Sequence, residues 1–550
     1  MRRLLGLIGL LTLAACGGSG DKNDSQQPGG MAGTSGVGGS EPGPDPSSVC
    51  GQSKIGLPRL RRLSRDELLH TLEDVFPEAK SAWTLKLSAD PISKHGFDND
   101  ATLLSVSNQT AGELDEAGKA AGAAVSGPAL ANMLPCSTSA PDATCAGQFL
   151  DKYGKRLFRR ALTPDEKTKY LALFTQASTA KGFPAGIAWL TRALVQSPHA
   201  VYRREIGVAQ NGTYQLTPAE IATQLAYDYT GTAPTEALLG KAEAGQLATP
   251  EALEATAREL LLSEPGLRTI ERFFDAWLHY GRTASVTKAN IPNFETLRDE
   301  MVAETRRFIG EVVVTQNGGL NELLTAPFTT PTPTLATFYG FPAPASSFAV
   351  TSRPAGRGIG ILAQGAILAA QSGPKASSPT KRGVLVMDRL LCRVVPPVPP
   401  TVPKLSDPMP GQFTTRQHYE EIHLNDAGCK SCHTRFDPIG FGFEHFDETG
   451  RYRDLDGGLP INAVSYMPGY PDPAQHLFEF ASQEELAQGL AAQKAPYECT
   501  TGLVSTYVNG VAEACLGETK RGAFIDRQVG FVDYLASLAA EPHFRQRRAP

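Results

Sequence analysis

The sequence lacks most of the patterns that assign a chain quickly to a well-known class of protein. After the N-terminus, no run of residues is long and apolar enough to cross a membrane, so we expect no membrane-spanning helix. Basic residues are dispersed, the formal net charge is −5, and no basic stripe alternates with aromatic side chains, so we expect no nucleic-acid partner. The patterns G-x-S-x-G and H-E-x-x-H and the P-loop are absent, which leaves no catalytic residue to assign.

The N-terminus has the pattern of a bacterial export signal. Arg2 and Arg3 precede an apolar run that is too short to span a membrane. Leu13-Ala14-Ala15-Cys16 resembles a lipobox, which implies that Cys16 is lipidated, and the glycine after it favours the outer membrane. We expect a lipoprotein signal peptide over residues 1–16 and an outer-membrane lipoprotein facing the periplasm or the cell surface. The alternative is a soluble periplasmic protein cleaved nearby. Residues 17–56 are rich in Gly, Ser and Pro, which predicts a disordered tether.

Cys429-Lys430-Ser431-Cys432-His433 is a C-x-x-C-H run, which is typical of c-type haem attachment. Cys429 and Cys432 can reach the two vinyl groups on one edge of a porphyrin, and His433 then binds the iron as its proximal ligand. The alternatives are a disulfide or half of a zinc site, but no second C-x-x-C or H-x3-5-H follows to complete a zinc site. The sequence therefore predicts one covalent haem c.

The other cysteines predict disulfides. The chain has nine cysteines, and setting aside Cys16 and the haem pair leaves an even set in an oxidising compartment. Cys136–Cys145 would close a small loop between helical segments, Cys499–Cys515 would bracket a helix, and Cys50–Cys392 is left by elimination. Buried thiols are the alternative, and the spacing does not fix the connectivity.

Helix-start patterns recur along the chain, whereas alternating strand patterns are scarce. Capping-box patterns begin at Ser64, Thr163 and Thr217, and apolar residues with helical spacing follow. Glu304, beside Arg306 and Arg307, is expected on a helix surface with local ion pairs. We predict a mainly α fold of several helical domains in series, with a small cytochrome-c-like haem segment near the C-terminus. The expected boundaries are 57–140, 141–207, 213–345, 355–465 for the haem-binding domain, and 475–545.

Several stretches resemble a family of secreted, multi-domain, uncharacterised proteins of planctomycetes and myxobacteria that carry a C-terminal cytochrome-c-like segment. The matching stretches are Leu60-Arg61-Arg62-Leu63-Ser64-Arg65-Asp66-Glu67, Phe158-Arg159-Arg160-Ala161-Leu162-Thr163, Leu194-Val195-Gln196-Ser197-Pro198, Ser378-Pro379-Thr380-Lys381-Arg382-Gly383, and Asp437-Pro438-Ile439-Gly440-Phe441-Gly442-Phe443-Glu444. The resemblance implies export and one covalent haem, with no established substrate. Where the family usually has Met, this chain has Phe436, which is expected to pack on the haem ring.

The second axial ligand decides the chemistry of a haem. His423 is the first candidate, because it lies six residues before Cys429 and similar proteins often have His there. Met467, Met409 and His418 follow, and an empty position stays open. Arg451, with Arg435 and Arg453, is a candidate for pairing with the propionates.

The first functional hypothesis is an exported, lipid-anchored c-type monohaem protein that transfers electrons in the bacterial envelope to a redox partner protein. One alternative is a haem-dependent oxidase, peroxidase or oxygenase acting on an unknown, for example polymeric, substrate; its support is size, since a bare electron carrier needs only about 100 residues. The other alternative is a non-enzymatic surface protein that binds a polymer or acts as a scaffold.

Overall fold

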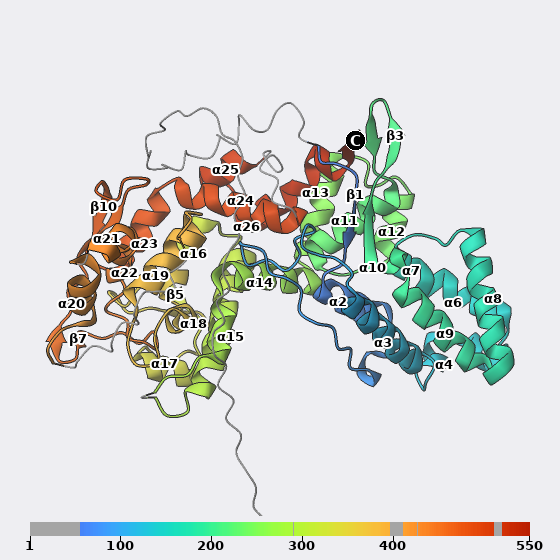
Figure 1. Cartoon of the computed structure of the whole chain (residues 1–550), viewed down its shortest axis with the longest axis horizontal. Helices are drawn as coiled ribbons and strands as arrows, with labels where there is room; N and C mark the ends of the chain where they lie inside the picture. The colour runs from blue at the N-terminus through green and yellow to red at the C-terminus, as the bar shows by residue number, and fades with distance from the viewer. Residues whose placement is uncertain (1–54, 290, 397–410, 426, 511–519, 550) are drawn as a thin grey trace, which may run out of the picture. The chain divides into compact units, whose positions relative to one another are not determined.

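Helices dominate the part of the chain that the structure describes, as the sequence predicts (Figure 1). The structure is a computed structural model that describes residues 55–289, 291–396, 411–425, 427–510 and 520–549, all within the unit Cys50–Pro550. The predictions for Cys16, the tether up to residue 54, Cys50, Met409 and Cys515 lie outside these residues. Across the described ranges, no helix combines the length and apolar composition needed to cross a membrane.

The helices in the first half of the chain are α2 (Arg65–Val75), α3 (Asn108–Val125), α4 (Leu130–Met133), α5 (Cys136–Ser139), α6 (Ala143–Phe149), α7 (Lys155–Phe158), α8 (Pro164–Lys181), α9 (Phe183–Gln196), α10 (Pro198–Val201), α11 (Pro218–Thr230), α12 (Glu236–Glu243), α13 (Pro250–Leu261) and α14 (Glu264–Leu278). Those that follow are α15 (Phe294–Ile309), which continues into a π-helix (Gly310–Thr315), α16 (Leu320–Thr325), α17 (Pro333–Tyr339), α18 (Gly365–Ala370), α19 (Pro379–Leu385), α20 (Thr415–Tyr419), which continues into a π-helix (Glu420–Leu424), α21 (Ala427–His433), α22 (Asp437–Phe441), α23 (Gln483–Ala492), α24 (Ala495–Asn509), α25 (Arg521–Ile525) and α26 (Phe531–Ser537).

Short antiparallel strand pairs join these helices. The strands are β1 (Arg59–Arg62) with β2 (Tyr202–Glu205), β4 (Thr213–Gln215) between β3 (Val208–Gln210) and β11 (Gln546–Arg548), β5 (Phe328–Thr329) with β6 (Thr351–Ser352), β7 (Leu455–Asp456) with β8 (Leu459–Pro460), and β9 (Ser465–Pro468) with β10 (His476–Phe480). The pairs β1–β2 and β4–β11 bring together segments that are far apart in the sequence. Such pairing was not visible in the sequence, because each strand is too short to show an alternating pattern.

The predicted helix starts are confirmed. The side-chain oxygens of Ser64, Thr163 and Thr217 each accept a hydrogen bond from a backbone N–H in the first turn of α2, α8 and α11, and a glutamate returns the bond to the cap in every case. These capping boxes satisfy donors that a helix start otherwise leaves without partners.

Two buried clusters form the hydrophobic cores. The smaller cluster contains apolar residues of α2, α3, α6, α8 and α9. The larger one extends from α11 to the C-terminal segment and includes Trp277, Phe436 and Phe531. The predicted segments 213–345, 355–465 and 475–545 all contribute to this larger core, so helices pack across these boundaries as well as within them.

The disulfide predictions are confirmed in part. Cys136 and Cys145 are bonded, as predicted, across a separation of 9 residues. The pairings Cys499–Cys515 and Cys50–Cys392 are wrong, because Cys392 is bonded to Cys499 across a separation of 107 residues. Spacing along the chain could not reveal this bond, since packing of α24 beside residues 386–390 brings the two thiols together.

The expectation for Glu304 is also wrong. Glu304 is fully buried within α15, where its carboxyl group accepts hydrogen bonds from Thr329 Oγ1 at 2.6 Å and from the Tyr339 hydroxyl at 3.1 Å. Burial raises the pKa of this carboxyl group above its ordinary value, although the positive charge of Arg353 opposes the change. A charged residue is seldom fully buried, so the local sequence gave no sign of this placement.

Candidate functional site

The C-x-x-C-H run lies on one short helix. Cys429, Cys432 and His433 all belong to α21, and Cys432 is exposed. Within the described residues, neither Cys429 nor Cys432 takes part in a disulfide. The described residues therefore do not show the disulfide alternative for this pair.

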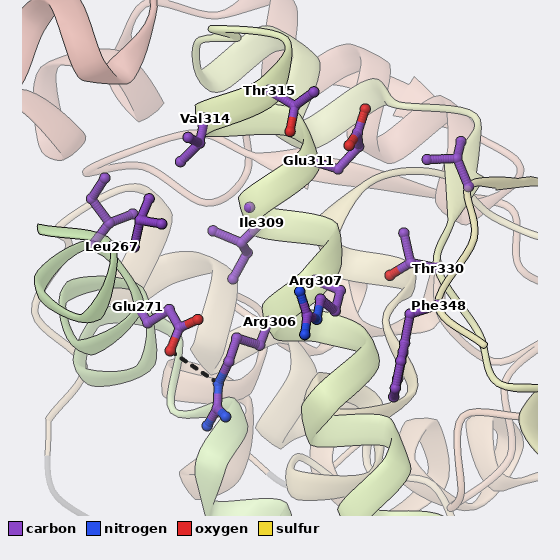
Figure 2. Close-up of a pocket in the computed structure, with 13 residues that line it drawn as sticks. Leu267, Glu271, Arg306, Arg307, Ile309, Glu311, Val314, Thr315, Thr330 and Phe348 are labelled. Carbon is purple, nitrogen blue, oxygen red and sulfur yellow. Dashed lines mark ion pairs between the residues drawn. The ribbon is translucent and has the colours of Figure 1, made fainter. Parts of the chain in front are cut away.

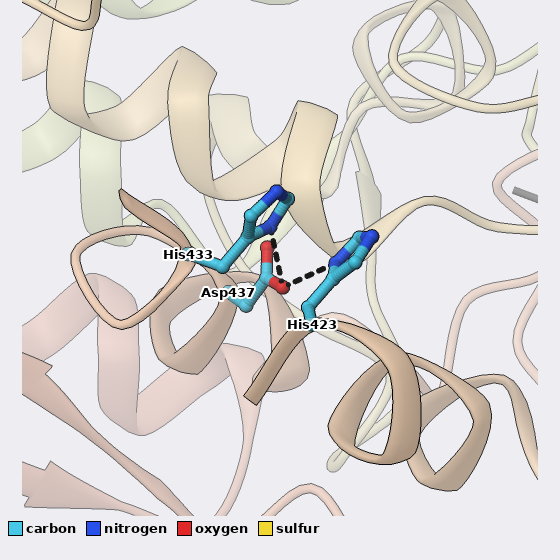
Figure 3. A group of neighbouring side chains, drawn as sticks. All are labelled: His423, His433 and Asp437. Carbon is cyan, nitrogen blue, oxygen red and sulfur yellow. Dashed lines mark hydrogen bonds and ion pairs between the residues drawn. The ribbon is translucent and has the colours of Figure 1, made fainter. Parts of the chain in front are cut away.

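His433 is fixed by a buried carboxylate. Its Nδ1–H donates to Asp437 Oδ2 at 2.9 Å, and Asp437, at the start of α22, is 0 % exposed (Figure 3). Because Nδ1 carries the proton in this bond, Nε2 of His433 is the basic nitrogen. A histidine that binds a metal through one nitrogen usually donates its other N–H to a carboxylate or carbonyl. The arrangement suits an axial haem ligand.

Close packing of α19 against α22 positions this carboxylate. A Cβ atom on Gly383 would lie 1.8 Å from the Phe436 carbonyl oxygen, and one on Gly440 would lie 1.9 Å from the Pro379 carbonyl oxygen. Glycine at both places therefore lets the two backbones approach. The approach brings Thr380 Oγ1 to within 2.6 Å of Asp437 Oδ1, to which it donates a hydrogen bond.

Asp437 remains ionised in this setting. Burial by itself would raise the pKa of Asp437, but hydrogen bonds from His423, His433 and Thr380 oppose it, and the net effect lowers the pKa below its ordinary value. A buried carboxylate that accepts several hydrogen bonds is favoured in its charged form. The site therefore holds a fixed negative charge next to His433.

His423 reaches the same carboxylate oxygen. Its Nδ1–H donates to Asp437 Oδ2, also at 2.9 Å, and the ring centroids of His423 and His433 lie 3.6 Å apart (Figure 3). The two Nδ1 atoms are thus separated by at most twice the hydrogen-bond length. Two imidazoles on opposite faces of one haem iron, each with a metal–nitrogen bond of about 2 Å, would hold their Nδ1 atoms roughly 8 Å apart. Axial ligation by both rings and sharing of Asp437 by both rings exclude each other.

Of the other residues predicted to contact haem, Phe436 packs against His433, and the rest have partners elsewhere or lie in the core. Phe436 is buried, and its ring meets the His433 ring edge to face with centroids 5.0 Å apart. Arg451 pairs with Asp447 at 3.3 Å, and Arg453 pairs with Asp456 at 2.6 Å. Met467 is 1 % exposed in β9, within the larger core. The haem-ligand and propionate roles of these residues, and of His418, stay predictions.

The residues present fit a covalent haem with His433 as its axial ligand. The thiols of α21 and Nε2 of His433 would supply the attachment and the ligand, and Asp437 would orient the ring. Donor atoms of His423, His433 and Asp437 also lie within 4.8 Å of one another. Two imidazoles and one carboxylate additionally suit a transition-metal ion.

The bond of Asp437 to His433 is not predicted by the sequence, in which Asp437 stands out only as part of a stretch that resembles the family. The sequence did contain one signal for this contact: Asp437 follows His433 by four residues. Side chains four residues apart lie close together where the chain is helical. Thr380 offered no local signal, because α19 lies far from α21 in the sequence and only the packing brings them together.

Comparison with known families gives matches over several stretches of the chain, one of which contains this site. Four family models, each described as a protein of unknown function, match the chain: DUF1587 (PSD3) at residues 61–126, DUF1595 (PSD5) at 145–205, DUF1592 (PSD4) at 216–341 and DUF1588 (PSCyt3) at 357–456. The matches support a multi-domain, cytochrome-like family whose function is not established, and the C-x-x-C-H run and Asp437 lie inside the DUF1588 match. No curated protein and no solved structure matches the chain.

A cavity of about 330 Å³ lies away from these residues, between α14 and the end of α15 (Figure 2). In this cavity Arg306 Nε pairs with Glu271 at 3.4 Å, and the Arg307 guanidinium lies 6.0 Å from the centroid of the Phe348 ring. None of the residues predicted to bind haem lines this cavity.

Proposed function

We propose that the chain is an exported, lipid-anchored c-type monohaem protein that transfers electrons in the bacterial envelope. The observation that carries the proposal is the bond from His433 Nδ1 to buried Asp437, next to the two thiols of α21. The match to a cytochrome-like family model over residues 357–456 supports it. Export and the anchor on Cys16 rest on the N-terminal sequence alone.

Each residue has a distinct role in this proposal. Cys429 and Cys432 attach the haem c, and His433 binds its iron through Nε2. Asp437 keeps the proton on Nδ1 and orients the ring, while Phe436 keeps water from one side of the site. When bound, the haem supplies an iron that alternates between two oxidation states, with a potential set by its axial ligands, hydrogen bonding and burial.

A second function, a haem-dependent oxidase, peroxidase or oxygenase, is favoured by one specific observation. His423 shares Asp437 Oδ2 with His433 and so lies on the same side of the site. To act as the second axial ligand, His423 would have to leave Asp437. An iron with an open position can bind small ligands such as oxygen or peroxide, whereas a six-coordinate iron suits electron transfer.

Absorption spectra separate the two functions. The chain is expressed with the machinery that attaches haem c, and spectra are recorded in the oxidised and reduced states, with and without carbon monoxide. A low-spin spectrum that does not change when carbon monoxide is added, and that becomes high-spin in His423→Ala, supports electron transfer with His423 as the second ligand. A high-spin spectrum that shifts with carbon monoxide, and is unchanged in His423→Ala, contradicts the electron-transfer proposal and favours the enzyme.

A further inference from the structure

A cavity of about 500 Å³ lies among segments that the haem proposal does not use. It is lined by residues of β1, α7, the α10–β2 segment and the start of α11. Its lining belongs to the stretches matched at residues 145–205 and 216–341, except for Leu60, immediately before the match that begins at residue 61, and Ile206, immediately after the match that ends at residue 205. Cavities of 300–1,000 Å³ where separate segments meet are the usual places for small ligands.

The walls of the cavity are mainly apolar. Phe158, Tyr202, Pro198 and Ile206 line it, and Leu60 is 60 % exposed. Leu60 pairs with Arg204 across the β1–β2 ladder, so the two side chains stand on the same face of the strand pair. An exposed leucine and a cation therefore adjoin each other in the lining.

The charges that line the cavity are mostly positive. Arg159, Arg160 and Arg204 line it, against the single acid Glu220. Two of these cations already have their partners. Arg160 forks onto Glu166 with two contacts of 2.8 Å, and buried Arg159 donates to the carbonyl oxygens of Ala200 at 3.0 Å and Tyr202 at 2.7 Å.

Arg204 is different, because its side chain is largely exposed and its ion pair is made through Nε. Its Nε lies 3.3 Å from Glu220 Oε1, and that oxygen also accepts from the backbone N–H groups of Ile206 at 3.1 Å and Gly207 at 3.2 Å. In the ranges that the structure covers, no hydrogen bond from the two terminal nitrogens of Arg204 is found, and the side chain is 60 % exposed. A guanidinium group can bind a carboxylate through two parallel N–H···O hydrogen bonds.

We propose that this cavity binds an amphipathic carboxylate of the fatty-acid type, with its apolar chain inside the cavity and its carboxylate on Arg204. A neutral apolar molecule would form no ion pair with Arg204, and a small inorganic anion would leave the apolar walls of the cavity in contact with water. The proposal is independent of the haem site, because it uses no residue of that site.

Isothermal titration of the full chain with decanoate, below its micelle concentration and at pH 8, tests this proposal. Decanol serves as the neutral ligand of equal chain length. Arg204→Gln removes the charge of this exposed side chain and leaves a shorter polar one. Arg306→Gln is the matched control, because Arg306 is a similarly exposed arginine that pairs through Nε with a glutamate at the other cavity. Leu60→Trp narrows the apolar part of the lining.

We expect one decanoate per chain, bound at least about tenfold more weakly by Arg204→Gln and bound normally by Arg306→Gln. Decanol should bind more weakly than decanoate and should not respond to Arg204→Gln, and Leu60→Trp should weaken both ligands. The proposal is overturned if decanoate does not bind, if it binds Arg204→Gln as tightly as the unaltered chain, or if Arg306→Gln weakens it equally.

Discussion

His423 and His433 donate to the same carboxylate oxygen of Asp437, each over 2.9 Å. One buried acid therefore fixes the tautomer of both imidazoles and leaves both Nε2 atoms basic. The same relationship prevents the two rings from binding one iron from opposite faces while both hydrogen bonds last. In the proposed haem protein, Asp437 would thus connect the proximal ligand, His433, with the occupancy of the second axial position.

Replacing Asp437 with Asn should raise the reduction potential of the attached haem. The carboxylate places a negative charge beside His433, and a negative charge near the iron stabilises its more positively charged oxidised state. A spectroscopic redox titration measures the potential. Thr380→Val is the control, because it removes the 2.6 Å hydrogen bond to Asp437 and a 3.5 Å contact with His433 Nδ1 but keeps the carboxylate, and it should shift the potential less. An unchanged potential in Asp437→Asn would contradict the assigned role of this residue.

The two disulfides should contribute unequally to stability. Cys392–Cys499 closes a span of 107 residues and Cys136–Cys145 a span of 9 residues. By the loop-closure relation, removing the first should cost about 5 kcal/mol and removing the second about 3 kcal/mol. Thermal unfolding of the two double serine variants compares these costs. A lower melting temperature for Cys136→Ser with Cys145→Ser would show that restriction of the unfolded chain is not the dominant effect.

Stability should rise with pH above pH 8 because of Lys288. Lys288 is 6 % exposed and donates to the carbonyl oxygens of Ala369 and Gly373, each at 2.9 Å. Burial lowers its pKa from 10.5 to about 8. The unfolded chain therefore holds this proton between those two values while the folded chain has lost it, and stability increases with pH across that window.

Urea unfolding at pH 7.5 and pH 9.5 measures this effect. The stability of the unaltered chain relative to Lys288→Met should increase by roughly 1–2 kcal/mol between the two conditions. If the difference in stability between the unaltered chain and Lys288→Met is the same at both pH values, Lys288 keeps its ordinary pKa in the folded chain.

Glu304 should tolerate an amide but not truncation. Glu304→Gln keeps a carbonyl oxygen that can accept from Thr329, and its amide nitrogen can donate to the Tyr339 hydroxyl, so its cost should be below about 1 kcal/mol. Glu304→Ala removes the acceptor of the Tyr339 hydroxyl, leaves Thr329 only its longer bond to Gln364 and creates a cavity, at a cost of about 3 kcal/mol. Denaturant midpoints of the two variants provide the comparison, and equal losses would rule out the hydrogen-bonded role.

Local signals in the sequence predicted the helices well, but the sequence did not reveal the contacts between distant segments. The capping boxes at Ser64 and Thr217 depend on residues three positions apart, so the sequence contains all the information for them. The Cys392–Cys499 bond and the burial of Glu304 depend on how distant helices pack. For the site, the C-x-x-C-H run was evident, whereas the sharing of Asp437 by two histidines needed the approach of α19 to α22.

The central claim is that Cys429 and Cys432 carry a covalent haem, and the intact mass of the exported chain tests it most directly. The chain is produced with the haem c attachment machinery, denatured, and compared with a variant in which both cysteines are replaced by alanine. We predict that the unaltered chain retains the mass of one haem after denaturation and that the double variant retains none. A denatured chain without added haem mass, from cells that mature a control cytochrome c normally, would contradict the account.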